Sequence, residues 1–431
     1  MKVLVLGAGA REQALCYKLS SSKVVGQLVT WPGGPGVRAQ GVPLLDCPRV
    51  APWSQVVAAA KAQGVTWVMV GPEQPLAEGF ADAALAIGLP VFGPVRAAAQ
   101  LESSKAFSKD VMAAAGIPTA AYAVARDRAE CAERAADLLV REGGVVLKAS
   151  GLAAGKGVFV CRTKQQVDDG LERLYGSMKE AAATVVVESL MTGRECSFFT
   201  FLGQGMPSYI GFAVDYKRLQ EGDLGPNTGG MGCYSPAPWL PRDAGTQIVN
   251  RVIAPLLKEL ARRGMTYTGC LYTGVMWTSE GPKVVEFNAR MGDPECQALC
   301  MQDKRDWGAL IAAKLGLGGY DGDFADPDFR GAGVAVGVVL ASAGYPFGKD
   351  ETPGYAVNAD WLKHGIGGAR VFGAAVKDTP AGLVTGSGRI VTVVADGKDF
   401  ATARAKAYEG ADVIAAQWPG AQLRRDIANG I

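Results

Sequence analysis

Histidine is almost absent from this chain of 431 residues, with His364 as its single example. Catalysis by imidazole would have to depend on that residue, which we expect to lie on the surface. C-x-x-C pairs are also absent, and nine cysteines are an odd number that does not suit a complete disulfide framework. Free thiols in a reducing cytoplasm are therefore expected. Cys296 and Cys300, four residues apart, are expected to pack together on one helix face and not to bind a metal.

Long apolar runs and charge of one sign are missing as well. No segment reaches the ~18 apolar residues of a membrane-spanning helix, and the N-terminus does not have the pattern of a signal peptide. The 44 basic and 42 acidic residues give a formal net charge of +2, and no basic run marks a nucleic-acid surface. These absences predict a cytoplasmic protein that binds small molecules, neither nucleic acid nor membrane, as a monomer or small homo-oligomer.

The first hundred residues alternate apolar strands with helical stretches. This alternation predicts an N-terminal α/β domain over residues 1–100, built on a doubly wound parallel sheet. The expected elements are strands at 2–6, 24–30, 67–70 and 90–92, and helices at 11–19 and 54–63.

Two further units are expected, over residues 101–325 and 326–431. The central unit combines a strand–loop–strand segment with longer strands and helices, and the last unit reads as an α+β domain. In the central unit we expect strands at 145–148, 158–161, 184–188, 197–202, 271–278 and 284–287, and helices at 105–115, 126–141, 244–263 and 294–301. In the last unit we expect strands at 332–341, 370–372 and 389–395, and a helix at 402–417.

The loop at residues 150–157 is the first site with chemical content. Three glycines and two alanines remove bulk, so that backbone N–H groups can close over an anion. Lys156 adds a positive charge within the loop, and Lys148 leaves the preceding strand towards it. The loop is not a Walker motif, because strand rather than helix follows it. Phosphate binding and an ordinary glycine hairpin are both open on this evidence.

A second site follows the apolar strand at 284–287. Alternate residues of a strand share a face, so Glu286 and Asn288 point the same way and Phe287 points to the other side. Two oxygen ligands on one face suit Mg²⁺, which takes few protein ligands and several phosphate oxygens. Arg290 would lie on that side if the strand continued, in position for a phosphate or carboxylate. A solvated strand end is the alternative.

Three glycines within four residues stand at Gly229, Gly230 and Gly232, soon after Asp215 and Lys217. Such density indicates close contact between the backbone and another group, and a flexible turn is the alternative.

Taken in order, these segments resemble the ATP-grasp domain, and the whole chain resembles the phosphoribosylamine–glycine ligase family. The matches run from the first residues to the last, which chance does not explain well. The matching stretches are Gly71-Pro-Glu-Gln-Pro-Leu76, Phe92-Gly-Pro94, Ala99-Gln-Leu-Glu-Ser-Ser-Lys105, Gly151-Leu-Ala-Ala-Gly-Lys-Gly157, Gly225-Pro-Asn-Thr-Gly-Gly-Met-Gly232, Tyr234-Ser-Pro-Ala-Pro238, Glu286-Phe-Asn-Ala-Arg290, Gly292-Asp-Pro-Glu295 and Arg424-Arg-Asp-Ile427.

The resemblance implies an ATP-dependent ligase that activates a carboxylate as an acyl phosphate and passes it to an amine. ATP is the implied co-substrate, and Glu286 and Asn288 are the implied ligands of Mg²⁺ or Mn²⁺. The implied ATP-binding residues are Lys105, Lys148, Gly155, Lys156, Gly157, Glu188, Ser189, Leu190, Glu195 and Lys217. The amine would contact Gly7, Gly9, Arg11, Glu12, Glu73, Asp215, Arg424 and Arg425. Lys148 would assist phosphoryl transfer, and Arg290 and Asp293 would orient the amino acid.

The chain departs from the family where histidine is usual, since Gln13, Tyr216 and Gly373 occupy those positions. Ser150 and Cys296 also replace usual residues, an aspartate and a threonine. The pattern predicts secure ATP use, with either the family's own amine or a different one in a specialised paralogue. Two other classes stay open. One is a dinucleotide binder, suggested by the first glycine turn although its third glycine is missing. The other is a regulator that has kept only the fold.

Overall fold

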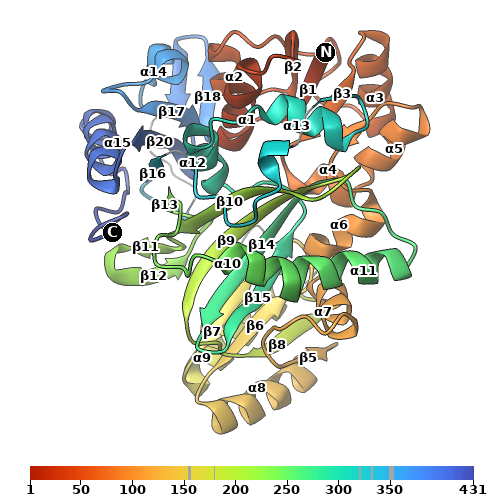
Figure 1. Ribbon diagram of the computed structural model, residues 1–431. Helices are drawn as coiled ribbons and strands as arrows, with labels where there is room; N and C mark the ends of the chain where they lie inside the picture. Colours follow the sequence, from red (N-terminus) through yellow and green to blue (C-terminus); the bar gives the residue numbers. More distant parts are fainter. Residues whose placement is uncertain (154–156, 179, 320–321, 332, 349–353) are drawn as a thin grey trace.

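The computed structural model describes residues 1–153, 157–178, 180–319, 322–331, 333–348 and 354–431 (Figure 1). The N-terminal region contains a four-stranded parallel sheet with strand order β2-β1-β3-β4, which confirms the predicted doubly wound sheet. Alternate residues of its strands pack into two separate apolar clusters: Val3 and Val5 face one, and Leu4 and Leu6 face the other. Both faces of this sheet are therefore covered, as parallel sheets require.

The elements of this region lie close to the predicted ranges. The second strand begins three residues later than expected, because Gly26 separates it from Val24, whose carbonyl accepts a hydrogen bond from the N-terminal amine. The elements are β1 (Lys2–Gly7), α1 (Ala10–Ser20), β2 (Gln27–Pro32), α2 (Pro35–Ala39), α3 (Trp53–Ala62), β3 (Trp67–Val70), α4 (Glu73–Ala77), α5 (Phe80–Ala86), β4 (Val91–Phe92) and α6 (Arg96–Ser103).

A small antiparallel sheet with strand order β5-β8-β6-β7 follows, with α8 and α9 packed on it at the bottom of Figure 1. Its helices begin where side chains cap them, since Ser104, Asp127 and Thr163 each accept a backbone N–H of the first turn. The elements are α7 (Lys105–Ala114), β5 (Tyr122–Ala125), α8 (Arg128–Glu142), β6 (Val145–Ala149), β7 (Val158–Cys161), α9 (Lys164–Ser177) and β8 (Val185–Ser189).

An eight-stranded sheet, ordered β15-β14-β9-β10-β13-β16-β20-β17, forms the centre of the molecule. It runs without interruption from strands of the predicted central unit into strands of the predicted C-terminal unit, and the two join where β13 pairs with β16. The elements before residue 325 are β9 (Arg194–Leu202), β10 (Ser208–Asp215), β11 (Arg218–Gln220), β12 (Leu224–Asn227), β13 (Gly232–Ser235), α10 (Ala244–Ile248), α11 (Ala254–Arg262), β14 (Gly269–Thr278), β15 (Gly281–Asn288), α12 (Glu295–Gln302) and α13 (Trp307–Lys314).

The single helix predicted at 244–263 is divided. A π-helical segment, Val249–Ile253, separates α10 from α11. Pro255 has no N–H to donate to the carbonyl four residues earlier, so the regular α-helical ladder cannot continue through this turn.

The C-terminal region adds α15 against β16 and β20, together with a short hairpin, β18–β19. His364 ends α14 and is exposed, as predicted. All nine cysteines are free, and Cys296 and Cys300 pack together in the core with their Sγ atoms 3.8 Å apart. The elements are β16 (Val334–Ala341), α14 (Ala359–His364), β17 (Arg370–Gly373), β18 (Val376–Thr379), β19 (Gly382–Thr385), β20 (Arg389–Gly397) and α15 (Phe400–Ala415).

Within the described ranges, no helix is both long enough and apolar enough to cross a membrane.

Candidate active site

A cavity of about 1050 Å³ lies between the small sheet and the large one. Lys148 of β6 and Glu188 of β8 reach it from the small sheet, and Glu286 and Asn288 of β15 reach it from the large sheet. Phe287, between the last two, packs into the apolar core beneath, as the strand alternation predicted.

The small-sheet side of the cavity has two lysines on one carboxylate. Glu188 is 1% exposed and forms ion pairs with Lys148 at 2.8 Å and with Lys109 at 3.2 Å. Burial lowers the pKa of Lys109 to about 8, although Glu188 opposes this change. Lys109 also donates to Thr119 at 2.6 Å. The sequence analysis did not identify Lys109. Its position four residues after Lys105 on the same predicted helix was the available signal, because residues four apart share a helix face.

The two predicted halves of the site meet at Lys148. Its Nζ donates to the backbone carbonyl of Val285 at 3.2 Å, and Val285 immediately precedes Glu286. The lysine that leads into the glycine loop therefore touches the strand that carries the predicted metal ligands. Burial by itself would raise the pKa of Glu286, but the charges of Lys105, Lys217 and Lys148 lower it below its usual value. Glu286 is held ionised among cations.

Lys105 stands at the start of α7 and lines the same cavity. Among the described residues, its Nζ has no hydrogen-bond or ion-pair partner, and its backbone N–H donates to Ser150 at 2.9 Å. Ser150 also accepts from Ala106 through its hydroxyl, at 3.1 Å. The glycine loop is thereby anchored at its first residue to the helix that carries this unpaired lysine.

A mixed group of charges forms the wall beyond β10. Lys217 pairs with Glu195, and both are about one-third exposed. Burial raises the pKa of Asp215 to about 8, with Lys217 opposing the shift and Glu295 adding to it. Ser197 donates to Glu295 at 3.2 Å. Asp215 is therefore an acid that can hold its proton near neutral pH.

Arg290 connects the strand end to the N-terminal region. Its Nη2 lies 2.6 Å from Glu102, its Nε lies 3.2 Å from Glu73, and its Nη1 donates to the carbonyl of Met291 at 3.2 Å. Burial would raise the pKa of Glu73, but Arg290 and Arg11 lower it to about 2. Glu102 also accepts from the N–H that follows Asn288, so this network fixes the end of β15.

Asp293 is held from two sides. Gln297 donates to its carboxylate at 3.0 Å, and Arg389 lies 3.3 Å from it. Burial would raise the pKa of Asp293, but Arg389 and Arg11 lower it. Arg389 comes from β20, 96 residues away, and no motif in the sequence indicated it.

The predicted glycine cluster meets this group. Arg389 donates to the carbonyls of Gly229 and Asp293, both at 2.6 Å. A side chain on Gly230, whose φ is +108°, would lie 2.6 Å from Pro294. Part of the close backbone contact that the glycines indicated is therefore contact within the chain.

Most predicted site residues line this cavity. Those that do are Arg11, Glu73, Lys105, Lys148, Gly157, Glu188, Ser189, Leu190, Glu195, Asp215, Lys217, Glu286, Asn288, Arg290 and Asp293. Gly155 and Lys156 lie outside the described residues. Gly7, Gly9, Glu12, Arg424 and Arg425 are not among the lining residues. Sequence reasoning also missed Glu102 and Glu295, although both stand in the matched stretches.

The first glycine turn is filled by its own glutamate. Glu12 is 3% exposed, accepts from the N–H of Gly9 at 2.6 Å and pairs with Arg11 at 2.8 Å. Its side chain packs so closely on Gly7 that a Cβ there would lie 2.4 Å away. An acid at this helix start occupies the place that a dinucleotide's diphosphate would need, which argues against a dinucleotide site.

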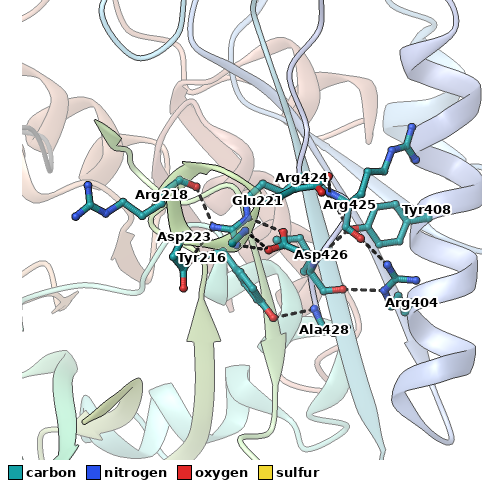
Figure 2. Close-up of polar contacts among 12 residues, drawn as sticks. Tyr216, Arg218, Glu221, Asp223, Arg404, Tyr408, Arg424, Arg425, Asp426 and Ala428 are labelled. Atoms are coloured by element: carbon teal, nitrogen blue, oxygen red, sulfur yellow. Dashed lines mark hydrogen bonds and ion pairs between the residues drawn. The ribbon is translucent and has the colours of Figure 1, made fainter. Parts of the chain in front are cut away.

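The C-terminal arginines are also engaged elsewhere (Figure 2). Arg424 is buried and forms ion pairs with Asp426 and Asp223, at 2.6 and 2.8 Å. Arg425 is exposed and pairs with Asp412. Neither arginine is among the residues that line the cavity, and the clamp of the two arginines on a substrate phosphate stays a prediction.

Two of the departures from the family pattern touch each other. Gln13 is fully buried, and its side-chain oxygen accepts from the N–H of Gly373 at 2.6 Å. Its amide donates to the carbonyls of Leu362 and Val371. Neither Gln13 nor Gly373 lines the cavity, so these two changes lie in packing behind it; Tyr216 does line it.

The donors on β15 fit a hard divalent cation. Among the described residues, no group of three or more His, Cys, Asp and Glu side chains is arranged to hold a metal. A metal at Glu286 and Asn288 would therefore take most of its ligands from phosphate and water, which is how Mg²⁺ binds with nucleotides.

A small antiparallel sheet that faces a larger one across a charged cavity is the architecture of the ATP-grasp class. Profiles of the phosphoribosylglycinamide synthetase N domain, ATP-grasp (A) domain and C domain match residues 1–102, 103–296 and 335–430. The chain belongs to the phosphoribosylglycinamide synthetase family.

Relatives and solved structures agree with this assignment. The chain is 39% identical over 433 residues to phosphoribosylamine–glycine ligase from Mesorhizobium japonicum, which covers 99% of this chain and 97% of the relative. The enzyme of that name from Brucella melitensis is 39% identical over 432 residues, with the same coverage. The crystal structure of phosphoribosylamine–glycine ligase from Thermotoga maritima has a TM-score of 0.81 at 28% identity, covering 99% of this chain and 100% of that one. The ADP complex of N5-carboxyaminoimidazole ribonucleotide synthetase, with a TM-score of 0.64 at 16% identity over 96% of this chain and 97% of that one, shares the fold.

Proposed function

We propose that this chain joins glycine to phosphoribosylamine, forming glycinamide ribonucleotide while ATP is converted to ADP and phosphate. One observation supports this most directly: Lys148, which leads into the glycine loop, contacts the backbone beside Glu286. Phosphate-binding and metal-binding groups then share one cavity, as phosphoryl transfer to a carboxylate requires. The full-length relatives named for this reaction support the choice of substrates.

In this proposal ATP lies between the two sheets. Residues 188–190 border the adenine, and Glu195 with Lys217 contacts the ribose side. Lys105 and Lys148 meet the phosphates, together with the loop that contains Gly155, Lys156 and Gly157. The Nζ of Lys105, which has no hydrogen-bond or ion-pair partner among the residues that the structure describes, supports this assignment, because such a half-buried ammonium is ready to pair with an anion.

Glu286 and Asn288 would hold Mg²⁺, with Mn²⁺ as a substitute. When bound, this ion spreads the charge that develops on the transferred phosphoryl group. Lys148 and the loop amides would donate hydrogen bonds to the oxygens of the transferred phosphoryl group. The ion pair with Glu188 orients Lys148 for this contact.

The amino acid would lie beside Arg290 and Asp293. Arg290 offers a second N–H on Nη1 to the carboxylate, beyond its bond to Met291. Asp293, whose pKa is low, stays ionised and pairs with the ammonium group. A carboxylate oxygen attacks the γ-phosphorus, ADP leaves, and the acyl phosphate is then attacked by the amine, releasing phosphate and forming the amide. Arg11, Glu73 and Asp215, which line the cavity, are the proposed amine side.

The reaction is placed in the cytoplasm, with small molecules as partners. The free state of all nine cysteines supports a reducing compartment.

A product assay tests the proposal. ATP, glycine and freshly generated phosphoribosylamine are supplied with Mg²⁺, and the products are identified by mass spectrometry. We expect glycinamide ribonucleotide and ADP in equal amounts. A parallel panel of other amines and amino acids is followed by ADP release. Turnover with a panel compound but none with phosphoribosylamine would refute the assigned substrates. No ADP with any pair would refute the ligase.

A further inference from the structure

The segment after α15 is tied to the hairpin of β11 and β12 (Figure 2). This segment, residues 424–428, is called the clasp below. Arg424, which is 1% exposed, donates to both carboxylate oxygens of Asp426 within the clasp, at 2.7 and 2.6 Å. Its Nη1 crosses to the hairpin and donates to Asp223 at 2.8 Å and to the carbonyl of Arg218 at 3.1 Å. One guanidinium therefore joins the two segments.

Further contacts run along the same interface. At the turn of the hairpin, the N–H of Gly222 donates to Asp426 at 2.9 Å. At its base, the N–H of Ala428 donates to the Tyr216 hydroxyl at 2.9 Å, and the Arg424 guanidinium lies 4.7 Å from the centre of the Tyr216 ring. The clasp is thus attached to both ends of the hairpin.

The backbone marks this interface as well. Asp223 and Ala428 have φ of +55° and +53°, and among the described residues they are the non-glycine positions with positive φ. One stands in the hairpin and the other in the clasp. Such conformations persist where surrounding contacts hold them in place.

The base of the hairpin forms part of the cavity wall. Lys217, Asn227 and Thr228 line the cavity, and both the N–H and the hydroxyl of Thr228 donate to the carbonyl of Lys217, at 2.7 and 2.9 Å. Lys217 in turn pairs with Glu195. The turn itself, residues 221–225, is exposed. A two-stranded hairpin is marginally stable on its own, so its position depends on what holds it.

We propose that Arg424 is a positioning residue, which through the clasp holds the β11–β12 hairpin so that Lys217 and Thr228 stand at the nucleotide cavity. This inference rests on the proposed function, since it assigns the cavity to ATP. Arg424 acts through Asp223 and the hairpin backbone, without touching a substrate.

The test uses the full chain with Mg-ADP as the probe. ADP affinity is measured by calorimetry for the wild type, Arg424→Lys, Asp223→Asn and the double variant. Hydrogen exchange is followed in residues 216–228 and in α15. Lysine cannot form the paired bonds of the guanidinium. Asparagine tolerates positive φ while removing the charge. Asp412→Asn, which breaks the exposed pair with Arg425 and leaves the hairpin contacts intact, is the matched control.

We expect each single variant to weaken ADP binding roughly fivefold to tenfold, the effect of losing a charge-assisted hydrogen bond. The double variant should bind ADP no more weakly than the single variant with the lower affinity, because both substitutions remove the same connection between Arg424 and Asp223. Exchange should become faster in the hairpin and stay unchanged in α15, and Asp412→Asn should match the wild type.

Faster hairpin exchange with unchanged ADP affinity would overturn the positioning role, and unchanged exchange would overturn the clasp itself. Asp223→Asn decides the matter if Arg424→Lys does not fold, because the Asp223 side chain is 72% exposed. Failure of the wild type to bind Mg-ADP would overturn the proposed function and this inference together. Normal binding by every variant would overturn the inference alone.

Discussion

At the cavity, the Nζ of Lys105 has no hydrogen-bond or ion-pair partner within the described part of the chain, whereas at the clasp Arg424 uses its Nε and both Nη atoms on groups of the protein. Lys105 is half-buried and Arg424 is 1% exposed. An unpaired cation in a cavity is ready for an anionic ligand, and a fully paired buried cation serves the fold.

The carboxylates of the two regions follow the same division. Burial would raise the pKa of Glu286, but the charges of Lys105, Lys217 and Lys148 lower it, and none of these three lysines forms an ion pair with Glu286. Asp426 also has a lowered pKa in spite of burial, but there Arg424 binds it directly. The family resemblance assigned both Arg290, which lines the cavity, and Arg424, which does not, to substrate binding. The ion pairs and hydrogen bonds that each side chain forms distinguish the groups that face the cavity from those that hold the clasp.

The largest effect should come from Glu286→Gln, which keeps the volume and removes the charge. We expect kcat for ADP formation to fall by a factor of about 1000 or more, because metal and phosphoryl group lose their anionic anchor. Single-turnover assays over a range of Mg²⁺ concentrations measure this. Glu280→Gln, on the exposed turn of the same β14–β15 hairpin, is the control and should stay active. A fall of less than tenfold in Glu286→Gln would remove the metal role from this residue.

Lys105→Met should have the next largest effect. A half-buried lysine whose Nζ has no partner in the described parts of the chain contributes little to folding, so the unfolding temperature should stay within about 1 °C of the wild type. KM for ATP should rise about 10- to 100-fold, since a charge-assisted contact to phosphate is lost. Lys258→Met, an exposed lysine of α11, is the control for the change of charge. A large loss of stability with unchanged KM would show that Lys105 is structural and would break the comparison.

Much of the fold followed from local pattern. The strand at Trp67–Val70 and the strand at Val158–Cys161 have the predicted bounds, because each is a short apolar run between turn signals. The strand β10 was not predicted, although residues 209–214 form a largely buried apolar run that is interrupted only by Gly211. The hairpin β11–β12 was not predicted because its short strands mix polar and apolar residues without clear alternation. The continuous eight-stranded sheet could not be predicted either, because pairing between distant strands such as β13 and β16 leaves no local trace.

The site divides in the same way. Glu286 and Asn288 were identified because residues two apart on a strand point to the same face. Arg389 was missed because it reaches Asp293 from a different region of the chain. Arg424 was assigned to the substrate because sequence matching shows that a residue is shared, without showing what its side chain touches. Its partners Asp223 and Arg218 lie about 200 residues away in the chain.

Asp215→Asn tests whether the cavity wall holds a protonated acid. The pKa of Asp215 rises from 3.8 to about 8 through burial, with Lys217 opposing the change and the carboxylates of Glu295, Glu195 and Glu286 adding to it. Between these two values the unfolded chain ionises Asp215 and the folded chain does not, so stability falls as pH rises. The variant should therefore gain stability relative to the wild type from pH 5 to pH 8, on the order of 2 °C. Thermal unfolding at matched salt measures the difference, and a gap that does not change with pH would contradict the raised pKa.

The smallest effect is expected for Arg425→Ala. Arg425 and its partner Asp412 are each 51% exposed, and exposed ion pairs contribute roughly 0–1 kcal/mol. Because the Arg425 side chain does not line the cavity, KM for phosphoribosylamine and for ATP should change by less than about twofold. Steady-state kinetics measures both KM values. Arg424→Lys, for which ADP affinity is expected to fall, is measured in parallel for comparison. A tenfold rise in KM for phosphoribosylamine alone would place Arg425 on the substrate phosphate, as the sequence first suggested, and would require the exposed arginine to leave Asp412 when substrate binds.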